Sequence, residues 1–501
     1  MELYSGNENY KLFHGNMLDM LEVIQPESID AIITDPPYGL TSITKRFGKE
    51  GSAPAQFGTD GAFSRLSKGF MGKEWDGSGI EYNIDAWRKC FTVLKDGGYL
   101  LAFGGTRTFH RIACAIEDAG FEIRDTIMWI YGSGFPKSLN LGLAIDKKLG
   151  IESEDTGEIS PNARPNSTKD NTLYESGTVG KSFTIKKATN EWAGWGTSLK
   201  PAYEPIIVAR KPFKGSLVDN VLENGVGGLN IDECRVPFEN TPNPATNPLY
   251  RLNAGYKPVP KGSVSDGVFG FKSGQNDANE NGRFPANVIL TYDETDFDEV
   301  CGGFPDTKSV EGEPNYDKSN TNPIINFLSG SGAIKSGVHY GDEGSAARYF
   351  YCAKASKRDR DAGLDEFEEK QKYYCDGRSN SLEIFGSTDG GRKPCRNIHP
   401  TVKPVELMQY LIRLVAPKGS VILDPFNGSG STGKACMYEN NDNNKDYFYI
   451  GIELTDEYLP ISKARIEHAQ TDKERLENVY VDKINNIVYE NASLFDILEE
   501  E

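Results

Sequence analysis

Four consecutive residues, Asp35-Pro36-Pro37-Tyr38, combine groups that could act on a planar base. Asp35 offers a carboxylate, and Tyr38 offers an aromatic face on which a base could stack. Proline fixes φ and has no N–H group, so two successive prolines keep the backbone stiff and its carbonyls free to accept hydrogen bonds. A carboxylate, a fixed carbonyl and an aromatic ring suit a base that carries an exocyclic amine. The motif alone is equally compatible with a structural turn after a strand.

A second stretch has the glycine spacing of a nucleotide-binding turn. It reads Asp424-Pro425-Phe426-Asn427-Gly428-Ser429-Gly430, and a third glycine follows at Gly433. Glycines here let the backbone turn sharply and approach a ligand closely. The apolar run at 447–452 ends in Glu453, where an acidic side chain could accept hydrogen bonds from ribose hydroxyls. A glycine pattern between a strand and a helix, with an acid at the next strand end, indicates a nucleotide-type site.

Both motifs follow short apolar runs, which are typical of buried parallel strands. Residues 29–34 form the first run and residues 421–423 the second. Open α/β sheets bind ligands at the carboxyl ends of such strands. Helix-like and strand-like segments alternate between the two runs, at 84–94, 99–103, 109–119, 121–130, 204–209 and 404–415. This alternation predicts an α/β fold with a doubly wound, mostly parallel, Rossmann-like sheet.

Two kinds of nucleotide ligand fit the glycine-rich turn: a nicotinamide or flavin dinucleotide, or S-adenosylmethionine. The Asp424 carboxylate at the entrance of the turn would repel a pyrophosphate and attract a sulfonium cation. The acid therefore favours S-adenosylmethionine as the cofactor.

Several segments resemble one enzyme family. Asp-Pro-Pro-Tyr at 35–38 resembles the catalytic motif of the amino-methyltransferases, which methylate adenine N6 or cytosine N4 in DNA with S-adenosylmethionine. The motif at 424–430 is similar to the cofactor motif of that family, and 399–404 to a segment that contacts the cofactor from the opposite side. The catalytic motif comes first, which resembles the circularly permuted β-arrangement of these enzymes. The stretches 69–76 and 349–364 look like phage and prophage members.

The resemblance implies a role for individual residues. Asp35, Pro36, Pro37 and Tyr38 would be catalytic. An Asp usually follows Gly15 in the turn ahead of the catalytic strand, and here that residue is Asn16. The implied cofactor-binding residues are Asn16, Met17, Asp35, His399, Thr401, Lys403, Asp424, Phe426, Gly428, Ser429, Gly430 and Glu453.

The resemblance also divides the chain. The expected parts are a catalytic half (1–140), an insertion (141–198), a returning core strand (199–212), a large, loop-rich target recognition module (213–395), a cofactor-binding half (396–470) and an acidic tail (471–501).

Charge bears on how the chain could bind DNA. The net charge of −18 argues against indiscriminate nucleic-acid binding, because phosphate affinity comes from basic surface. Two local clusters could still contact DNA, although a solvated face is the alternative for each and the more common one for a cluster such as the second. Their residues are Lys45 and Arg46, in a stretch with interleaved aromatics, and Lys354, Lys357 and Arg358.

Cysteine use and hydropathy suggest a compartment. Eight scattered cysteines do not form a secreted disulfide framework, and no apolar run approaches the length of a membrane span. Cys375, Cys395 and His399 include no Cys-x-x-Cys pair, so no metal is expected. We expect a cytoplasmic protein of a bacterium or a phage-infected cell.

The expected function is sequence-specific methylation of adenine N6 in double-stranded DNA. The resemblance favours adenine because family members with Asp at the position of Asp35 are mostly adenine enzymes. A cytosine-N4 enzyme, a methyltransferase of RNA or protein amides, and a catalytically idle, cofactor-binding DNA-recognition protein are the alternatives. A homodimer and a cognate restriction endonuclease are left open as partners.

Overall fold

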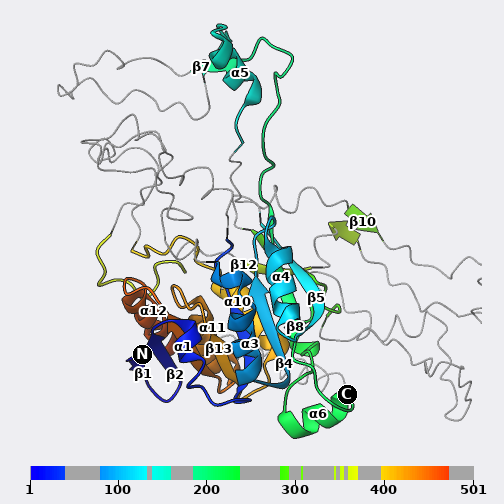
Figure 1. Ribbon diagram of the computed structural model, residues 1–501, viewed down its shortest axis with the longest axis vertical. Helices are drawn as coiled ribbons and strands as arrows, with labels where there is room; N and C mark the ends of the chain where they lie inside the picture. The colour runs from blue at the N-terminus through cyan, green and yellow to red at the C-terminus, as the bar shows by residue number, and fades with distance from the viewer. Residues whose placement is uncertain are drawn as a thin grey trace, which may run out of the picture.

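A ten-stranded sheet forms the centre of the computed structural model (Figure 1). Its strand order is β1-β2-β14-β13-β3-β4-β8-β5-β9-β12. The residues described are 2–39, 79–131, 138–159, 184–236, 282–292, 306–308, 343–345, 350–354, 359–369 and 396–472. The sheet strands are β1 (Glu2–Gly6), β2 (Tyr10–His14), β3 (Ile29–Thr34), β4 (Leu94–Phe103), β5 (Glu122–Tyr131), β8 (Tyr203–Arg210), β9 (Val288–Tyr292), β12 (Tyr351–Lys354), β13 (Val421–Asp424) and β14 (Phe448–Glu453).

Most neighbouring strands of this sheet are parallel, as predicted. Among the described strands of the ten-stranded sheet, the antiparallel pairs are β1 with β2, β4 with β8, and β8 with β5. All six residues of β3 are buried, including Asp30, whose carboxylate accepts hydrogen bonds from Val421 N and Lys95 Nζ. Because its acid is paired in this way, β3 can lie in the middle of the sheet.

Helices cover both faces of the sheet. The first face packs against α10 (Val405–Val415), α11 (Ser431–Asn443) and α12 (Leu459–Thr471). The second packs against α1 (Met17–Met20), α3 (Ile84–Val93) and α4 (Phe109–Asp118). The result is a three-layer α/β fold with one hydrophobic core on each side of the sheet.

Helix α10 shows how the sequence specifies one of these layers. Pro404 precedes its first residue, where the missing N–H costs nothing. The predicted apolar face is buried, and it consists of Leu407, Tyr410, Leu411, Leu414 and Val415. Met408, Gln409 and Ile412 are buried as well, because α11 lies alongside.

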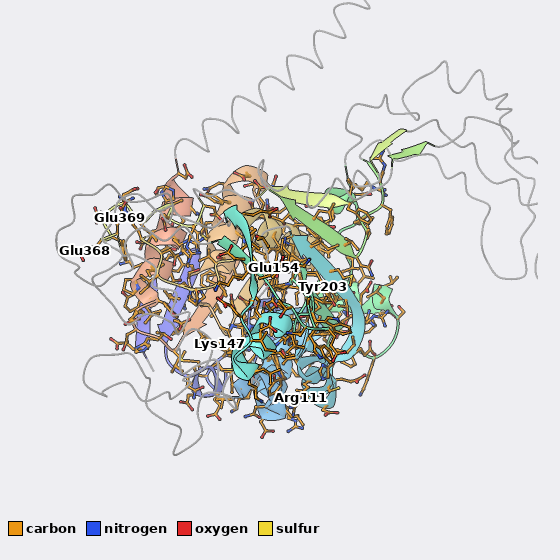
Figure 2. The ribbon with its side chains drawn as sticks, turned by 90° about the horizontal axis from the view of Figure 1, so that it is seen from above. Arg111, Lys147, Glu154, Tyr203, Glu368 and Glu369 are labelled. Carbon is orange, nitrogen blue, oxygen red and sulfur yellow. The ribbon has the colours of Figure 1, made fainter. Side chains whose placement is uncertain are left out.

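Smaller elements lie around the sheet. In Figure 1, α5 (Leu141–Leu149) and β7 (Thr184–Lys187) lie apart from it. In Figure 2, Lys147 and Glu154 lie over the middle of the molecule, while Glu368 and Glu369 lie on the rim. Helix α6 begins with a capping box between Ser216 and Asp219. The smaller elements around the sheet are η4 (Ile80–Tyr82), α5 (Leu141–Leu149), β6 (Glu154–Ile159), β7 (Thr184–Lys187), α6 (Leu217–Asn224), η5 (Asp232–Cys234), β10 (Asp306–Lys308) and β11 (Glu343–Ser345).

The sheet extends further than the expected division of the chain. Strands β9 and β12 come from 213–395, the expected recognition module, yet both continue the sheet in parallel beyond β5. The short apolar run at 288–290 therefore belongs to a strand of the main sheet, between β5 and β12, and not to the core of a separate module. In the part of the chain that the structure describes, no helix is long and apolar enough to cross a membrane.

Candidate active site

A cavity of about 1520 Å³ lies where the parallel strands end. Both predicted stretches line it, with Asp35 and Tyr38 on one side and Gly428 and Glu453 on the other. Pockets for one small molecule usually measure about 300–1,000 Å³. The cavity therefore has room for a nucleotide cofactor and a second planar ligand.

The two stretches meet because β13 pairs in parallel with β3. In this register Ile422 lies opposite Ala31, so both strands end at the same edge. The side chains after that point interact directly, since Thr34 Oγ1 donates a hydrogen bond of 2.6 Å to Asp424 Oδ1. This contact joins two residues that lie 390 positions apart in the sequence.

Asp35 forms an ion pair with Lys403. Lys403 Nζ lies 2.6 Å from Asp35 Oδ2, whereas Asp35 Oδ1 is buried and has no hydrogen-bond partner among the described residues. Burial raises the pKa of the Asp35 carboxyl, and the Lys403 ammonium counteracts that rise. Burial also disfavours the charged form of Lys403, but the Asp35 and Glu204 carboxylates outweigh it and raise the Lys403 pKa. Lys403 therefore stays an ammonium that holds one carboxylate oxygen and leaves the other open.

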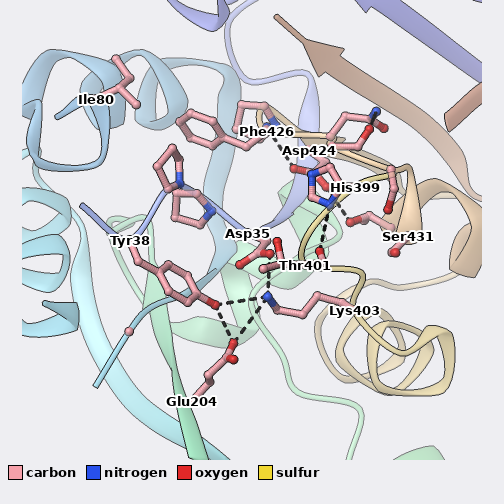
Figure 3. Close-up of a pocket in the computed structure, with 18 of the residues that line it drawn as sticks. Asp35, Tyr38, Ile80, Glu204, His399, Thr401, Lys403, Asp424, Phe426 and Ser431 are labelled. Atoms are coloured by element: carbon pink, nitrogen blue, oxygen red, sulfur yellow. Dashed lines mark hydrogen bonds and ion pairs between the residues drawn. The ribbon is translucent and has the colours of Figure 1, made fainter. Parts of the chain in front are cut away.

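Tyr38 and Glu204 complete a four-residue cluster with this ion pair (Figure 3). The Tyr38 hydroxyl donates a hydrogen bond of 2.6 Å to Glu204 Oε2, and Lys403 Nζ lies 3.4 Å from the same oxygen. Lys403 Nζ also donates to the Tyr38 hydroxyl oxygen at 3.2 Å. Lys403, expected to contact the cofactor, thus bonds to the motif expected to be catalytic, and we call Asp35, Tyr38, Glu204 and Lys403 the carboxylate–lysine cluster.

Asp424 is held by three hydrogen bonds at the start of the glycine-rich turn. Its Oδ1 accepts from Thr34 and from Phe426 N, and its Oδ2 accepts from Thr432 Oγ1 at 2.6 Å. Burial raises the pKa of its carboxyl to about 6, against the effect of these donors. The Asp424 carboxylate thus stabilises the turn, and it also lines the cavity.

Gly428 lies between Glu453 and His399. Its N–H donates to Glu453 Oε2 at 2.7 Å, and Thr455 N donates to Glu453 Oε1. Gly428 has a positive φ of 53°, and a Cβ there would lie 2.8 Å from His399 Nε2. Burial and the nearby Lys403 charge lower the His399 pKa to about 3, so its ring is neutral at pH 7. Only glycine fits at position 428, so the backbone there is exposed to the cavity.

Nearly all the other predicted cofactor residues line the same cavity. They are Asn16, Met17, Thr401, Phe426 and Ser429. Asn16 also caps α1 by accepting a hydrogen bond from Leu18 N. Gly430 is the exception, because it is not among the described lining residues and a Cβ there would lie 2.5 Å from Ser462 Oγ on α12. Gly430 closes the turn against a helix and does not face the cavity.

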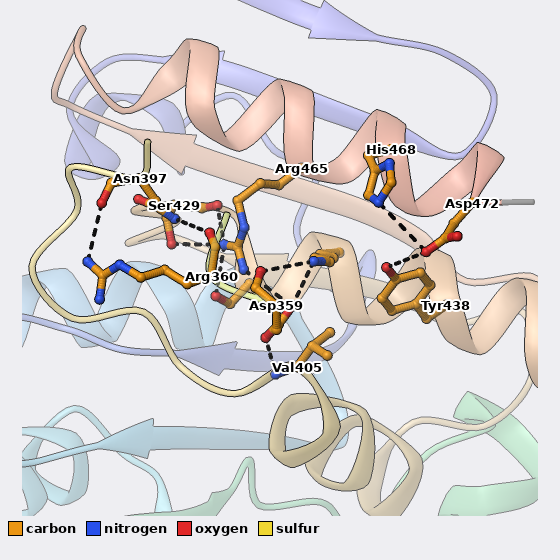
Figure 4. A network of polar contacts seen from close by, with 11 residues as sticks. Asp359, Arg360, Asn397, Val405, Ser429, Tyr438, Arg465, His468 and Asp472 are labelled. Atoms are coloured by element: carbon orange, nitrogen blue, oxygen red, sulfur yellow. Dashed lines mark hydrogen bonds and ion pairs between the residues drawn. The ribbon is translucent and has the colours of Figure 1, made fainter. Parts of the chain in front are cut away.

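A buried polar network supports the turn from behind (Figure 4). Arg465 Nη1 donates to Ser429 O at 2.7 Å and to Ser431 Oγ at 3.2 Å. Asp359 lies close by, with Oδ1 2.7 Å from Lys434 Nζ and 3.8 Å from Arg465 Nη2. The Arg465 guanidinium holds the glycine-rich turn in place through its hydrogen bonds to Ser429 and Ser431, and it lies outside the cavity.

The charges of the cavity suit a cationic ligand. Lys403 pairs with two of the carboxylates that line it, while Arg107 and Lys200 also belong to the lining. The four carboxylates are those of Asp35, Glu204, Asp424 and Glu453. A sulfonium nucleoside carries the opposite charge, and Glu453 keeps lone pairs that can accept ribose hydroxyls. The carboxylate acceptors and the glycine-rich turn therefore fit S-adenosylmethionine, which would supply an activated methyl group.

Some candidate residues were missed or fall elsewhere. Glu204, Arg107 and Lys200 line the cavity and were not expected there. Arg107 follows Gly104-Gly105 at the end of β4, so the strand-end rule that found Asp35 could have found it. Lys45, Arg46, Lys357 and Arg358 lie outside the described residues, and of Lys354 only the backbone, in β12, is described.

Comparisons with known proteins find one family model and several similar enzymes. A model of the N6_N4_Mtase family, described as DNA methylase, matches residues 29–464. The type II methyltransferase M.HindIII of Haemophilus influenzae is 24% identical over 238 residues, which cover 44% of this chain and 64% of that enzyme, less than two thirds of it. M2.LlaDCHI of Lactococcus lactis is 26% identical over 244 residues, covering 45% and 81% of the two chains.

The alignment with a solved structure of the cytosine-N4-specific PvuII DNA methyltransferase covers 97% of each chain at 11% identity, with a TM-score of 0.35. The family model spans both halves of the cavity. The chain therefore belongs to the N6/N4 DNA methylase family, with S-adenosylmethionine as its cofactor.

Proposed function

We propose that this protein is a sequence-specific DNA methyltransferase that methylates adenine N6. The observation that carries the proposal is the open oxygen of Asp35. Asp35 Oδ1 is a buried acceptor without a hydrogen-bond partner among the described residues, and it lies in the cavity beside Tyr38. A buried carboxylate oxygen requires a donor, and an exocyclic amine supplies one.

The chain's own residues would prepare the amine for transfer. The lone pair of an exocyclic amine is delocalised into the ring, and hydrogen bonds from its N–H groups to Asp35 Oδ1 and the Pro36 carbonyl favour a more nucleophilic nitrogen. Holding the base in one orientation contributes further, because a positioned reactant loses little entropy on reaction. No residue of the chain needs to form a covalent bond with the base.

The target base must leave the duplex to enter this cavity. Extrusion costs a few kcal/mol, and stacking on Tyr38 would return about 1–3 kcal/mol. Arg107 and Lys200 at the cavity are suited to the flanking phosphates, as are the basic residues of the two predicted clusters. We propose double-stranded DNA in the bacterial cytoplasm as the partner.

Adenine is preferred over cytosine because of the acid at position 35. In the family that the chain resembles, Asp at this position mostly accompanies adenine N6 activity. Cytosine N4 presents the same kind of amine and is the competing outcome.

The test is methyl incorporation into DNA of mixed sequence. Purified protein with labelled S-adenosylmethionine should place label in N6-methyldeoxyadenosine after digestion to nucleosides, and sequencing of modified DNA should give the target site. Label in N4-methyldeoxycytidine would correct the base, and binding without any incorporation would favour the idle recognition protein. Label in RNA or protein alone would overturn the proposal.

Asp35→Asn should lower the transfer rate by about 100-fold or more, because the amide removes the carboxylate that accepts from the amine. Binding of S-adenosylmethionine, measured by calorimetry, should stay within about twofold of the wild-type affinity. Asp85→Asn is the matched control, since Asp85 is an exposed acid at the start of α3 and is not among the cavity's described lining residues. Unchanged turnover in Asp35→Asn would contradict the assignment.

A further inference from the structure

Glu204 is an acid at the cavity that the predicted mechanism does not use. It lies near the start of β8, the strand that runs antiparallel to β4 and β5. Because β8 is reversed, its first residues lie at the edge where the parallel strands end. Its side chain is 20% exposed and turned toward Tyr38 and Lys403 (Figure 3).

Glu204 contacts three polar groups from three parts of the chain. Its Oε2 accepts the hydrogen bond of 2.6 Å from the Tyr38 hydroxyl and lies 3.4 Å from Lys403 Nζ. Its Oε1 accepts a longer hydrogen bond, 3.3 Å, from the Tyr131 hydroxyl on β5. The carboxylate thus joins the catalytic motif, the segment before α10 and the antiparallel part of the sheet.

We infer that Glu204 is a positioning residue for methyl transfer: it holds the Tyr38 ring by its hydroxyl and shares Lys403 with Asp35. This inference rests on the proposed function.

The first part of the argument concerns the Tyr38 ring. A tyrosine fixed only at its backbone can turn about two side-chain bonds, whereas one held at its hydroxyl as well is fixed at both ends. The backbone end is held too, since Tyr82 donates to the Tyr38 carbonyl at 3.2 Å. A Cβ on Gly105 would lie 3.2 Å from Tyr38 Cδ2, so the ring packs closely over that glycine. Glu204 thereby holds the stacking surface in one orientation before the base arrives.

The second part concerns Lys403. Its ammonium lies between the Asp35 and Glu204 carboxylates, 4.9 Å from the Phe103 ring centroid and 5.4 Å from that of Tyr38. An ammonium has three donors. With Glu204 and the Tyr38 hydroxyl taking two of them, one remains for Asp35 Oδ2, and Asp35 Oδ1 stays open for the amine.

Three variants separate the contributions of Glu204. Glu204→Gln keeps an acceptor for the Tyr38 hydroxyl but loses the charge, Glu204→Ala loses both, and Tyr38→Phe keeps the ring but loses the hydroxyl. We expect kcat to fall about 10-fold in Glu204→Gln and about 100-fold in Glu204→Ala, with KM for DNA changing less, because misplaced groups cost up to about 10²-fold. Glu122→Gln on the neighbouring β5 is the control, as Glu122 pairs with Arg210 and is not among the described lining residues.

The pH profile distinguishes this role from a purely structural one. The Glu204 charge raises the pKa of both Asp35 and Lys403, so its removal should move both limbs of the kcat profile to lower pH. The same shift is expected in Glu204→Gln and Glu204→Ala but not in Tyr38→Phe. The other ionisable groups that interact with this pair are Tyr38, Asp424 and His399, and all remain in the Glu204 variants. Tyr131 interacts with Glu204 itself.

Melting temperatures test the contact without any activity. If Glu204 holds the Tyr38 hydroxyl, the double variant Glu204→Ala with Tyr38→Phe should melt no lower than Glu204→Ala alone. Additive melting shifts, or Glu204 variants with wild-type kcat and pH profile, would overturn the inference. A wild-type protein that methylates no DNA would instead overturn the proposed function, while the melting cycle would still decide whether Glu204 holds Tyr38.

Discussion

At the level of single residues, the cavity depends on carboxylates that the fold keeps away from water. Asp424 and Glu453 lie on neighbouring strands, and burial raises their pKa to about 6 and about 7. Burial raises the pKa of these carboxyls, and hydrogen bonds from backbone and hydroxyl donors lower it. A bound ligand changes both effects, so it also changes how readily these groups ionise. A cationic ligand should therefore bind with a pH dependence that reports these acids.

Affinity for S-adenosylmethionine should rise by up to about 10-fold between roughly pH 6 and 8. The Glu453 carboxyl, with a pKa of about 7, is protonated at the lower pH, and its ionised form accepts stronger hydrogen bonds from ribose hydroxyls. Calorimetric titrations across this range would measure the slope. Glu453→Gln should bind more weakly and lose most of the slope, whereas S-adenosylhomocysteine, which has the same ribose, should show it. Affinity of the wild type that does not vary with pH would refute this role for Glu453.

At the level of elements, the glycine-rich turn depends on how closely α11 approaches the sheet. Gly433 lies in the first turn of α11, and a Cβ there would lie 2.5 Å from Tyr449 Cε1 on β14 and 2.7 Å from Ile466 Cδ1 on α12. The third glycine of the motif therefore serves helix–sheet packing, while Gly428 serves the cavity.

Gly433→Ala should destabilise the protein by about 1–3 kcal/mol, because the added methyl overfills a packed core. Denaturant or thermal unfolding would measure the loss. Gly228→Ala is the matched control, since no described atom lies within 4 Å of a Cβ there, and it should change stability by less than about 0.5 kcal/mol. Equal stability of the two variants would show that α11 can move away from β14.

At the level of the whole molecule, segment 359–369 of the expected recognition module packs against the cofactor-binding half. Asp359 pairs with Lys434 and Arg465, whose side chains are 1% and 0% exposed, and Arg360 donates to the Asn397 and His399 carbonyls. The segment thus packs behind the glycine-rich turn. The charges of Asp359, Lys434 and Arg465 are buried because the segment and the cofactor-binding half meet there.

Asp359→Asn should cost about 3–5 kcal/mol of unfolding free energy, because it leaves Lys434 and Arg465 buried without an anionic partner at this position. Asp365→Asn is the control, since Asp365 is 85% exposed in its ion pair with Arg396 and exposed pairs contribute little. Equilibrium unfolding in urea would compare them. A small loss in Asp359→Asn would mean that water or another group reaches the two cations.

The sequence by itself determined the local chemistry of both strand ends. The apolar runs at 29–34 and 421–423, the two prolines and the glycines at 428 and 433 are short-range patterns, and β3, β13 and the turn follow them closely. The apolar period after Pro404 likewise predicted α10. Such patterns suffice because backbone preferences and burial act over a few residues.

Only the tertiary structure decided which of these residues meet. The pairing of Lys403 with Asp35 spans 368 residues, and the bond from Tyr38 to Glu204 depends on the reversed direction of β8. Periodicity predicts that a strand exists but not which neighbour it takes, because pairing is set by packing between segments far apart in the chain. For the same reason β9 and β12 read as parts of a separate module, although hydrogen bonds to their neighbours place them in the main sheet.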